Sequence, residues 1–290
     1  MLPDRGVVSV TGADARSFLD NLITNDMALL DGQEAIHAAL LTPQGKILFE
    51  FFVVKTPAGF LLETSLSQTA ALAKRLAMYK LRAKVDIKDA AGEVVVAVLQ
   101  GDVRARPQGV IAFEDPRTKE LGDRLLIPGP LVGDVLARMG AQRMLPESYV
   151  ALRIAAGVPE AGVDFVLGDT FPHEANFDRL HGASFSKGCY VGQEVVARMQ
   201  NKTVVRKRIV KVRGSGPLRS GAEVKAGEAV IGLIGSVAGH TALATLRLDR
   251  AVEAVDKEQP LVADGVALVV DAVALSDYRA SLAEKFVTAP

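Results

Sequence analysis

The sequence predicts an α+β fold followed by a small β-barrel, and three features of the chain support this prediction. Strand-like, hairpin and helical segments alternate in the first part of the chain, in an order typical of antiparallel sheets with helices on one face. The pattern of a doubly wound parallel sheet is missing. Beyond Lys207, short β-rich runs recur between glycines, as in a small barrel. We therefore expect one domain over residues 1–206 and a C-terminal barrel domain over residues 207–290.

The first elements follow from the spacing of apolar and turn-forming residues. Residues 7–10 predict a strand, and Thr11 then opens a helix as its N-cap, with Asp14 in the capping-box position. The turn at 42–45 has proline second and glycine fourth, as a type I turn prefers, so it joins a hairpin whose second strand is 46–54. Further elements expected here are a strand at 60–63, a helix capped by Ser65 and Gln68 that buries Ala70, Ala73, Leu76 and Ala77, and strands at 81–87 and 94–99.

The middle of the chain predicts two helices and a long irregular segment. One helix runs through Leu131 and Met139 and is closed by Gly140, and another spans residues 147–156. Residues 158–186 show little periodicity. Because their aromatic and acidic content argues against disorder, we expect this segment to be functional.

Composition excludes several classes of function. The chain has 290 residues, zero formal net charge and one cysteine, so it contains neither an internal disulfide framework nor a four-cysteine cluster site. Glycine-rich phosphate loops and a hydrolase nucleophile elbow are missing. No apolar run is long enough to cross a bilayer, and the first residues do not read as a secretory signal, so we expect a cytoplasmic protein without membrane partners.

The only cysteine stands in the run from Ser186 to Glu194, beside Lys187 and between two glycines. Nearby positive charge and the N-terminus of a following helix both favour a thiolate, which makes Cys189 and Lys187 the candidate reactive pair. The alternative is that Cys189 is a small buried apolar residue in a tight turn.

Residues 185–198, FSKGCYVGQEVVAR, resemble the signature of the YgfZ-type folate-binding proteins of iron-sulfur cluster assembly. That family is related to the glycine-cleavage aminomethyltransferase, or T-protein, family. Weaker similarity lies in the segments 22–26, 41–46, 79–85, 152–159, 171–177 and 205–208.

The resemblance implies an aminomethyltransferase-like folate-binding fold in which residues 1–206 form two intertwined subdomains. It also implies a tetrahydrofolate-binding factor that assists the assembly or repair of iron-sulfur clusters, with Cys189 as the functional thiol. The implied cofactor is tetrahydrofolate, with or without a polyglutamyl tail. The implied partners are iron-sulfur client or assembly proteins.

Two departures from the aminomethyltransferases argue against glycine cleavage. Phe49 replaces one acid of the pair that follows the early hairpin turn, and Ala155 stands where those enzymes place a folate-binding glutamate. A pterin ring needs buried acceptors, so we expect this activity to be absent. A folate-dependent aminomethyl or one-carbon transferase remains the alternative.

Six residues are candidate folate contacts: Glu174, Asn176, Tyr190, Gln193, Glu194 and Arg198. Glu174 lies among apolar neighbours and could replace the lost carboxylate, although it could also be a surface loop residue. Asn176 belongs to the same segment.

The other four candidates belong to the cysteine motif and the helix after it. Tyr190 offers a stacking surface and a hydroxyl, or simple packing. Gln193 could bind a pterin or the backbone, and Glu194 could contact a ligand or favour the helix dipole. Arg198 is spaced to pair with Glu194.

A basic run lies on the predicted strand after the motif and on its approach. It is either a solvated face or an attraction for an anion, such as a folate glutamyl tail or an RNA backbone. Arg82 and Lys84 could extend it. An RNA-binding module that affects tRNA modification is therefore a second alternative, against which the zero net charge argues. The run contains Lys202, Arg206, Lys207, Arg208, Lys211 and Arg213.

Overall fold

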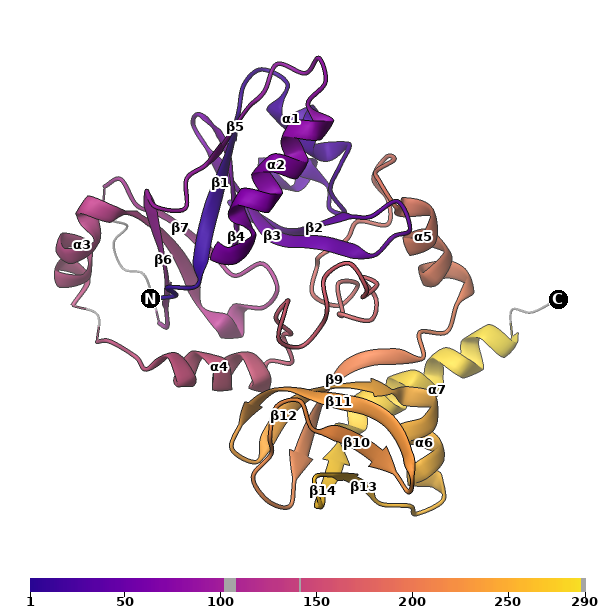
Figure 1. Cartoon of the computed structure of the whole chain (residues 1–290). Coiled ribbons are helices and arrows are strands. Elements are labelled where there is room, and N and C mark those ends of the chain that lie inside the picture. The colour runs from indigo at the N-terminus through magenta and orange to yellow at the C-terminus, as the bar shows by residue number, and fades with distance from the viewer. Residues whose placement is uncertain (102–107, 141, 288–290) are drawn as a thin grey trace. The chain divides into compact units, whose positions relative to one another are not determined.

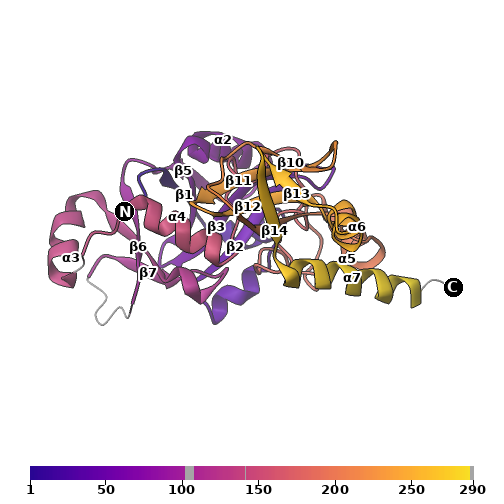
Figure 2. The same ribbon diagram turned by 90° about the horizontal axis from the view of Figure 1, so that it is seen from below.

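The computed structural model describes residues 1–101, 108–140 and 142–287. The chain divides into two compact units, whose helices and strands are labelled in Figures 1 and 2. Unit 1 comprises Met1–Pro146 and Asp178–Gln193, and unit 2 comprises Glu147–Phe177 and Glu194–Pro290. Each unit is thus built from segments that are distant in the sequence. The expected division between residues 206 and 207 stays a prediction.

Unit 1 contains a five-stranded antiparallel sheet in the order β2-β3-β4-β1-β5. Successive residues of its strands are buried, and because successive side chains point to opposite faces, both faces of the sheet are covered. Val8 and Phe51 pack with the two helices on one face, whereas Val7 and Phe52 pack with the second sheet on the other. The elements are β1 (Arg5–Thr11), α1 (Ala15–Asp20), β2 (Ala35–Leu41), β3 (Ile47–Thr56), β4 (Gly59–Ser65), α2 (Thr69–Tyr79) and β5 (Asp86–Asp89).

A second sheet of three antiparallel strands, ordered β6-β8-β7, completes unit 1. Its outer face packs against α3 through Leu125, Ile127 and Val135, and α3 ends at Gly140 in the left-handed conformation, as predicted. The elements are β6 (Val94–Leu99), β7 (Ile111–Glu114), β8 (Asp123–Pro128) and α3 (Val132–Met139). Short 3₁₀ helices of unit 1 lie at Met27–Asp31, Leu66–Gln68, Lys119–Leu121 and Gly129–Leu131.

Charged side chains join the two sheets of unit 1. Glu63 on β4 accepts hydrogen bonds from Arg5 at 2.7 Å and from Arg124 on β8 at 2.8 Å. Asp115 accepts from Arg117 and Arg124. Burial tends to raise the pKa of Asp115, but the two guanidinium groups outweigh it and hold this pKa far below its usual range. All three arginines are therefore neutralised inside the unit, as buried charges must be.

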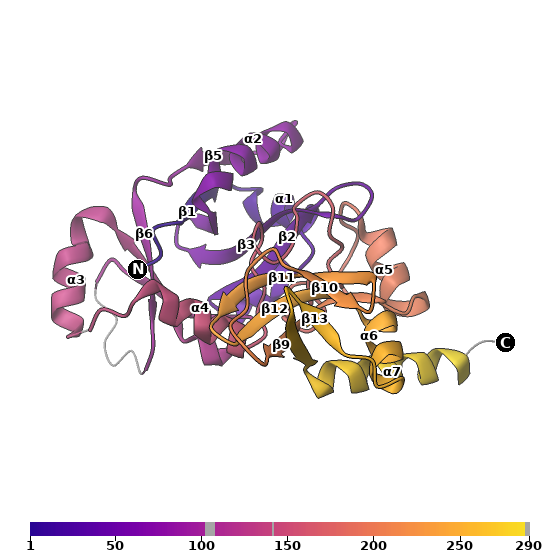
Figure 3. The same cartoon turned by 60° about the horizontal axis from the view of Figure 1, so that its bottom comes forward.

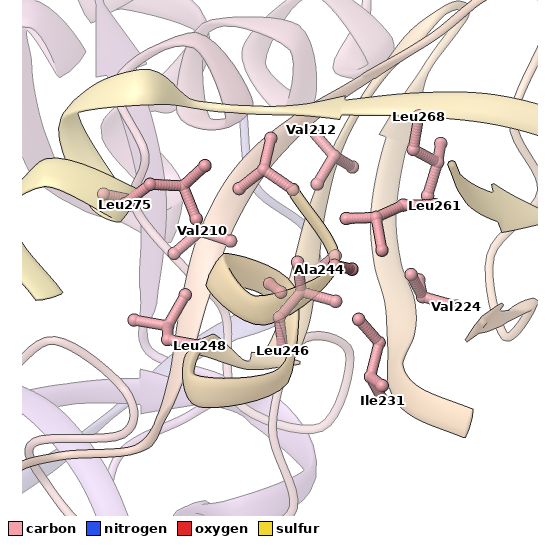
Figure 4. Packing of buried hydrophobic residues seen from close by; sticks show 14 of the residues in the cluster. Val210, Val212, Val224, Ile231, Ala244, Leu246, Leu248, Leu261, Leu268 and Leu275 are labelled. Atoms are coloured by element: carbon pink, nitrogen blue, oxygen red, sulfur yellow. The ribbon is translucent and has the colours of Figure 1, made fainter. Parts of the chain in front are cut away.

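The core of unit 2 is a closed barrel with the strand order β10-β11-β12-β9-β14-β13. Figure 4 shows its aliphatic interior, to which α6 and α7 contribute Leu248 and Leu275. The helices are α4 (Pro146–Ala155), α5 (Gln193–Lys202), α6 (Leu248–Asp256) and α7 (Ala272–Val287), and the strands are β9 (Lys207–Gly214), β10 (Glu223–Ala226), β11 (Ala229–Ala238), β12 (Thr241–Arg247), β13 (Leu261–Ala263) and β14 (Val266–Val270).

The α+β class, the early hairpin and the C-terminal barrel are confirmed, but several local predictions are wrong. The first helix begins at Ala15 rather than after Thr11, because the Asp14 carboxylate accepts from the Lys84 backbone N–H at 2.7 Å and does not cap the helix. The strand expected at 81–87 overlaps β5 only at residues 86 and 87, because β5 spans Asp86–Asp89. The predicted barrel domain includes residues 248–256 and 272–287, but these residues form the helices α6 and α7 and not barrel strands.

In α2 the buried face differs from the predicted one. Thr69, Leu72 and Leu76 are buried, whereas Ala70 and Ala77 are exposed. The larger side chains thus occupy the core, and two alanines remain at the surface.

In the parts of the chain that the structure describes, no helix combines the length and apolar character that a membrane crossing requires.

Candidate functional site

Cys189 lies in a loop of unit 1 that we call the Cys189 loop, residues 184–192. The Ser184 hydroxyl accepts from the backbone N–H groups of Ser186 and Lys187 at 3.4 and 3.2 Å, which shapes the start of the loop. The Cys189 side chain is exposed and free. The alternative of a buried packing residue is thereby excluded, and the thiol is accessible to a reagent or partner.

Lys187 holds the Cys189 loop against residues 20–25. Its side chain is only 1 % exposed, and Nζ donates to the backbone oxygens of Asp20, Ile23 and Asn25 at 2.6, 3.2 and 2.7 Å. Burial lowers the pKa of Lys187, while the Asp20 carboxylate at 3.0 Å opposes this shift. These contacts make Lys187 a positioning residue; its expected effect on the thiol stays a prediction.

Residues 22–26 form hydrogen bonds both with the chain just before the Cys189 loop and with strand β2. The Thr24 hydroxyl donates to the Gly182 carbonyl at 2.6 Å and accepts from the Ala39 N–H on β2 at 2.8 Å. The Asn25 amide donates to the His181 carbonyl at 2.7 Å. The chain before the Cys189 loop is therefore fixed to the first sheet through side chains.

Gly192 brings the end of the loop onto the β2–β3 turn. Its φ is +81°, and a Cβ added there would lie 2.6 Å from the Thr42 oxygen and 3.0 Å from the Gly45 Cα. Only glycine permits this approach without strain. The segments 22–26 and 41–46 and the cysteine motif, which are far apart in the sequence, thus meet in unit 1.

Tyr190 carries a buried hydroxyl that has no hydrogen-bond partner among the described residues. The residue is 7 % exposed, and its ring centroid lies 5.5 Å from the Lys187 ammonium. Burial raises the pKa of Tyr190 to about 12, so the phenol is neutral. A buried hydroxyl is normally paired, so the Tyr190 hydroxyl is an exception among the described residues.

A buried His37–Glu50 pair is a feature that sequence reasoning missed. His37 Nε2 lies 2.9 Å from Glu50 Oε1, and Nδ1 lies 3.1 Å from the Leu180 carbonyl oxygen. Burial tends to raise the pKa of Glu50, but the hydrogen bond from His37 and nearby arginines outweigh it and lower this pKa. Both imidazole nitrogens lie within hydrogen-bond distance of oxygen atoms, so His37 links β2 to β3 and to the chain at Leu180.

In unit 2, the polar atoms of Glu174 and Asn176 are engaged by the protein. The Glu174 carboxylate accepts from the Phe171 N–H at 3.0 Å. Asn176, at φ +61°, donates to the Ile209 carbonyl at 2.7 Å and accepts from Arg208 at 3.3 Å. These bonds fasten the segment 171–177 to β9.

The remaining folate candidates lie at the start of α5. The Gln193 N–H donates to the Tyr190 carbonyl at 3.2 Å, and Gln193 is the first helical residue, as expected after the motif. Glu194 and Arg198 are exposed, and among the described residues they form no ion pair with each other. Tyr190 and Gln193 belong to unit 1 and the other four candidates to unit 2, so a shared folate pocket stays a proposal.

The basic run is not one continuous exposed strip. Arg208 is 8 % exposed and donates to the His173 carbonyl at 2.7 Å, which corrects its expected place on a solvated face. Lys211 lies 3.4 Å from the Asp271 carboxylate. Arg206 and Arg213 are exposed.

A cavity of about 420 Å³ in unit 2 is lined by α4, β9, β12, β14 and the start of α7. Ala155, which the sequence resemblance places where the aminomethyltransferases have a glutamate, lines it. Among the described lining residues only Asp271 carries a carboxylate, which already accepts from the Val273 N–H at 2.9 Å. The cavity therefore offers a pterin ring no uncommitted carboxylate.

Comparison with known structures defines the class of fold. The glycine cleavage system aminomethyltransferase T from Bartonella henselae is similar with a TM-score of 0.75 and 18 % identity, over 93 % of this chain and 84 % of that chain. Residues 206–274 match the family described as the CAF17 C-terminal beta-barrel domain. The chain thus has the aminomethyltransferase-like fold with a C-terminal barrel, as predicted.

Curated relatives define the family. The mitochondrial iron-sulfur cluster assembly factor IBA57 of Mus musculus is 33 % identical over 276 residues, which cover 85 % of this chain and 76 % of that protein. The IBA57 homolog of Mycosarcoma maydis is 35 % identical over 225 residues, 72 % of this chain and 55 % of that protein. This chain belongs to the IBA57 family of iron-sulfur cluster assembly factors. It spans about half the length of several fungal relatives, for example 52 % in Neurospora crassa.

These relatives confirm that the chain resembles proteins named iron-sulfur cluster assembly factors, whereas its own role and partners, folate binding and the role of the thiol stay proposals. They also correct one expectation. The predicted cytoplasmic location is wrong by this comparison, because the relatives are named mitochondrial proteins.

Proposed function

We propose that this protein assists the assembly or repair of iron-sulfur clusters in client proteins, with Cys189 as its functional thiol. The observation that carries the proposal is an exposed thiol on a loop that Lys187 and Gly192 hold in place. An accessible thiol on a fixed loop is suited to bind a soft metal ion as its thiolate, with loss of the thiol proton, or to replace a partner's thiolate as a ligand of that metal. The family of the chain supports the same role.

A single cysteine limits this chemistry to a shared cluster. Iron-sulfur clusters usually have four protein ligands, and this chain offers one thiolate. Cys189 would therefore supply one ligand to a cluster that is otherwise held by a client or assembly partner. The cluster is then the substrate of the protein and not its resident cofactor.

We further propose that unit 1 binds a reduced folate, which when bound supplies a one-carbon acceptor. One observation supports a fit: the buried Tyr190 hydroxyl has no partner among the described residues, and a polar group of a folate would provide one. Glu174 and Asn176 belong to unit 2, where their polar atoms bond to Phe171 and Ile209, so we assign them no contact with this folate.

Tyr190→Phe is expected to raise the stability of the free protein by about 1 kcal/mol, because it removes an unsatisfied buried hydroxyl. The same change should weaken tetrahydrofolate binding about tenfold, since the ligand loses a hydrogen bond. Thermal unfolding and calorimetric titration of the full chain measure both effects, with Tyr79→Phe as the control in the same unit. An unchanged affinity for Tyr190→Phe would remove Tyr190 from the folate site.

The assembly role is tested in cells that lack the protein. We expect enzymes that need iron-sulfur clusters to lose activity, while enzymes without clusters keep theirs, and the wild-type chain to restore the difference. Equal activities of both enzyme classes in the deficient cells would contradict the role.

Two residues argue against the alternative of a folate-dependent transferase. Ala155 lines a cavity without a free carboxylate among its described residues, and Phe49 is buried in the core.

A further inference from the structure

The outer face of α2 and the turn after it form a surface that neither the Cys189 loop nor the folate candidates use. The helix lies along β1 and β5 and buries its inner face in the core of unit 1 (Figures 1 and 3). Its outer face stays exposed. We call this surface the α2 patch; it consists of Ala70, Ala71, Lys74, Ala77, Met78 and Leu81.

Leu81 is the most unusual residue of the patch. Its side chain is 90 % exposed and its φ is +44°, a left-handed conformation that a bulky residue rarely adopts. The turn is closed by a hydrogen bond from the Ala83 N–H to the Lys80 oxygen at 2.8 Å. Met78, one helical turn earlier, is 64 % exposed. Neither side chain packs into the core, so the fold itself does not explain these apolar residues, and strain of this kind is characteristic of functional sites.

Most of the charged residues near the patch are cationic, whereas Asp86 and the Asp14 carboxylate, which accepts from the Lys84 N–H, lie beside Lys84. Residues 70–85 contain five cationic residues and no acidic one, although the whole chain is neutral. None of these five side chains forms an ion pair or hydrogen bond with another described residue. Many other arginines and lysines of the chain are paired with carboxylates. The five are Lys74, Arg75, Lys80, Arg82 and Lys84.

We propose that the α2 patch docks an acidic amphipathic helix of a partner protein. The three alanines leave the α2 backbone open to close approach by a second helix, and Met78 and Leu81 supply large side chains that fill the grooves of that helix. The unpaired cations then meet acidic residues along its flanks, which gives the contact its charge complementarity. The proposal depends neither on the iron-sulfur role nor on folate binding.

The same features favour a protein over RNA or a lipid surface. RNA would engage the cations but would gain nothing from an exposed leucine and methionine, and the aromatic residue beside them, Tyr79, is half-buried rather than free to stack. A membrane would require a broader apolar face than two large side chains provide.

The test uses the full chain and a fluorescein-labelled synthetic helix of about five turns, with leucines on one face and glutamates on both flanks. Fluorescence anisotropy should show binding that weakens as salt rises. A matched peptide with glutamine in place of glutamate should bind at least about tenfold more weakly.

Two variants locate the site. The first variant is Leu81→Gly, and the second combines Lys80→Gln, Arg82→Gln and Lys84→Gln. Each should weaken binding of the acidic peptide about tenfold. The matched controls are Val269→Gly, which removes a 72 % exposed valine of β14, and Lys119→Gln; both should bind as the wild type does. Leu81→Gly relieves the left-handed strain, so its thermal midpoint should not fall below that of the wild type.

Unchanged affinity in Leu81→Gly, or equal binding of the two peptides, would overturn the proposal. The same measurements are made with a hairpin RNA and with vesicles rich in phosphatidylglycerol. If either one binds more tightly than the acidic peptide and loses affinity in the same variants, the patch binds RNA or lipid instead of a protein helix.

Discussion

Replacing Lys187 by methionine is expected to lower the free energy of unfolding by about 3 kcal/mol. Methionine retains the length of the side chain but removes every hydrogen bond that the ammonium donates. The backbone oxygens of Asp20, Ile23 and Asn25 would then be left without this donor in a buried place. Buried acceptors that lose their partner cost more than the bond itself contributes.

The measurement is urea unfolding followed by circular dichroism, since the chain contains no tryptophan. The control is Lys119→Met, because the side chain of Lys119 is 85 % exposed and its loss should change stability by less than about 0.5 kcal/mol. Equal stability of the two variants would contradict the positioning role. Slower alkylation of Cys189 without a loss of stability would instead assign Lys187 to the thiol.

Gly192→Ala is expected to destabilise the protein by about 3 kcal/mol. An alanine at φ +81° is strained, and its Cβ would meet the backbone of Thr42 and Gly45 at 2.6 and 3.0 Å. Backbone atoms of a hairpin turn cannot move aside as the end of a flexible side chain can. The loop or the turn must shift, which would also displace Cys189.

Gly188→Ala is the matched control within the same loop. A Cβ at Gly188 meets no atom within 4 Å, and its φ lies outside the left-handed region. This variant should unfold within about 0.5 kcal/mol of the wild type. If Gly192→Ala proved equally harmless, the close packing of the Cys189 loop on the β2–β3 turn would not be part of the fold in solution.

Features with a local signal could be predicted from the sequence. The turn at 42–45 combines proline and glycine in fixed positions, Gly140 ends its helix, and short glycine-bounded runs indicate the barrel. The cysteine motif was likewise visible as one unbroken segment. Each of these features depends on neighbouring residues, so pattern and spacing are enough.

Features that depend on distant partners could not be predicted. Lys187 looked like a modifier of the adjacent thiol, yet its ammonium binds oxygens more than 160 positions earlier in the chain, at Asp20 and Asn25. Arg208 looked like part of an exposed strip, but it donates to the His173 carbonyl. Nothing periodic marks such long-range pairs, and the same holds for His37 and Glu50.

We propose that the Cys189 thiol, and not merely its loop, supports the maturation of iron-sulfur enzymes. The most direct test restores either the wild-type chain or Cys189→Ser to cells that lack the protein, at equal protein levels, and measures the activity of iron-sulfur enzymes. Serine keeps the size and a hydrogen-bonding atom but is a far poorer nucleophile and soft-metal ligand. Because Cys189 is exposed, the variant should fold and unfold as the wild type does. We predict that the wild type restores activity and Cys189→Ser does not; full restoration by Cys189→Ser would contradict the account.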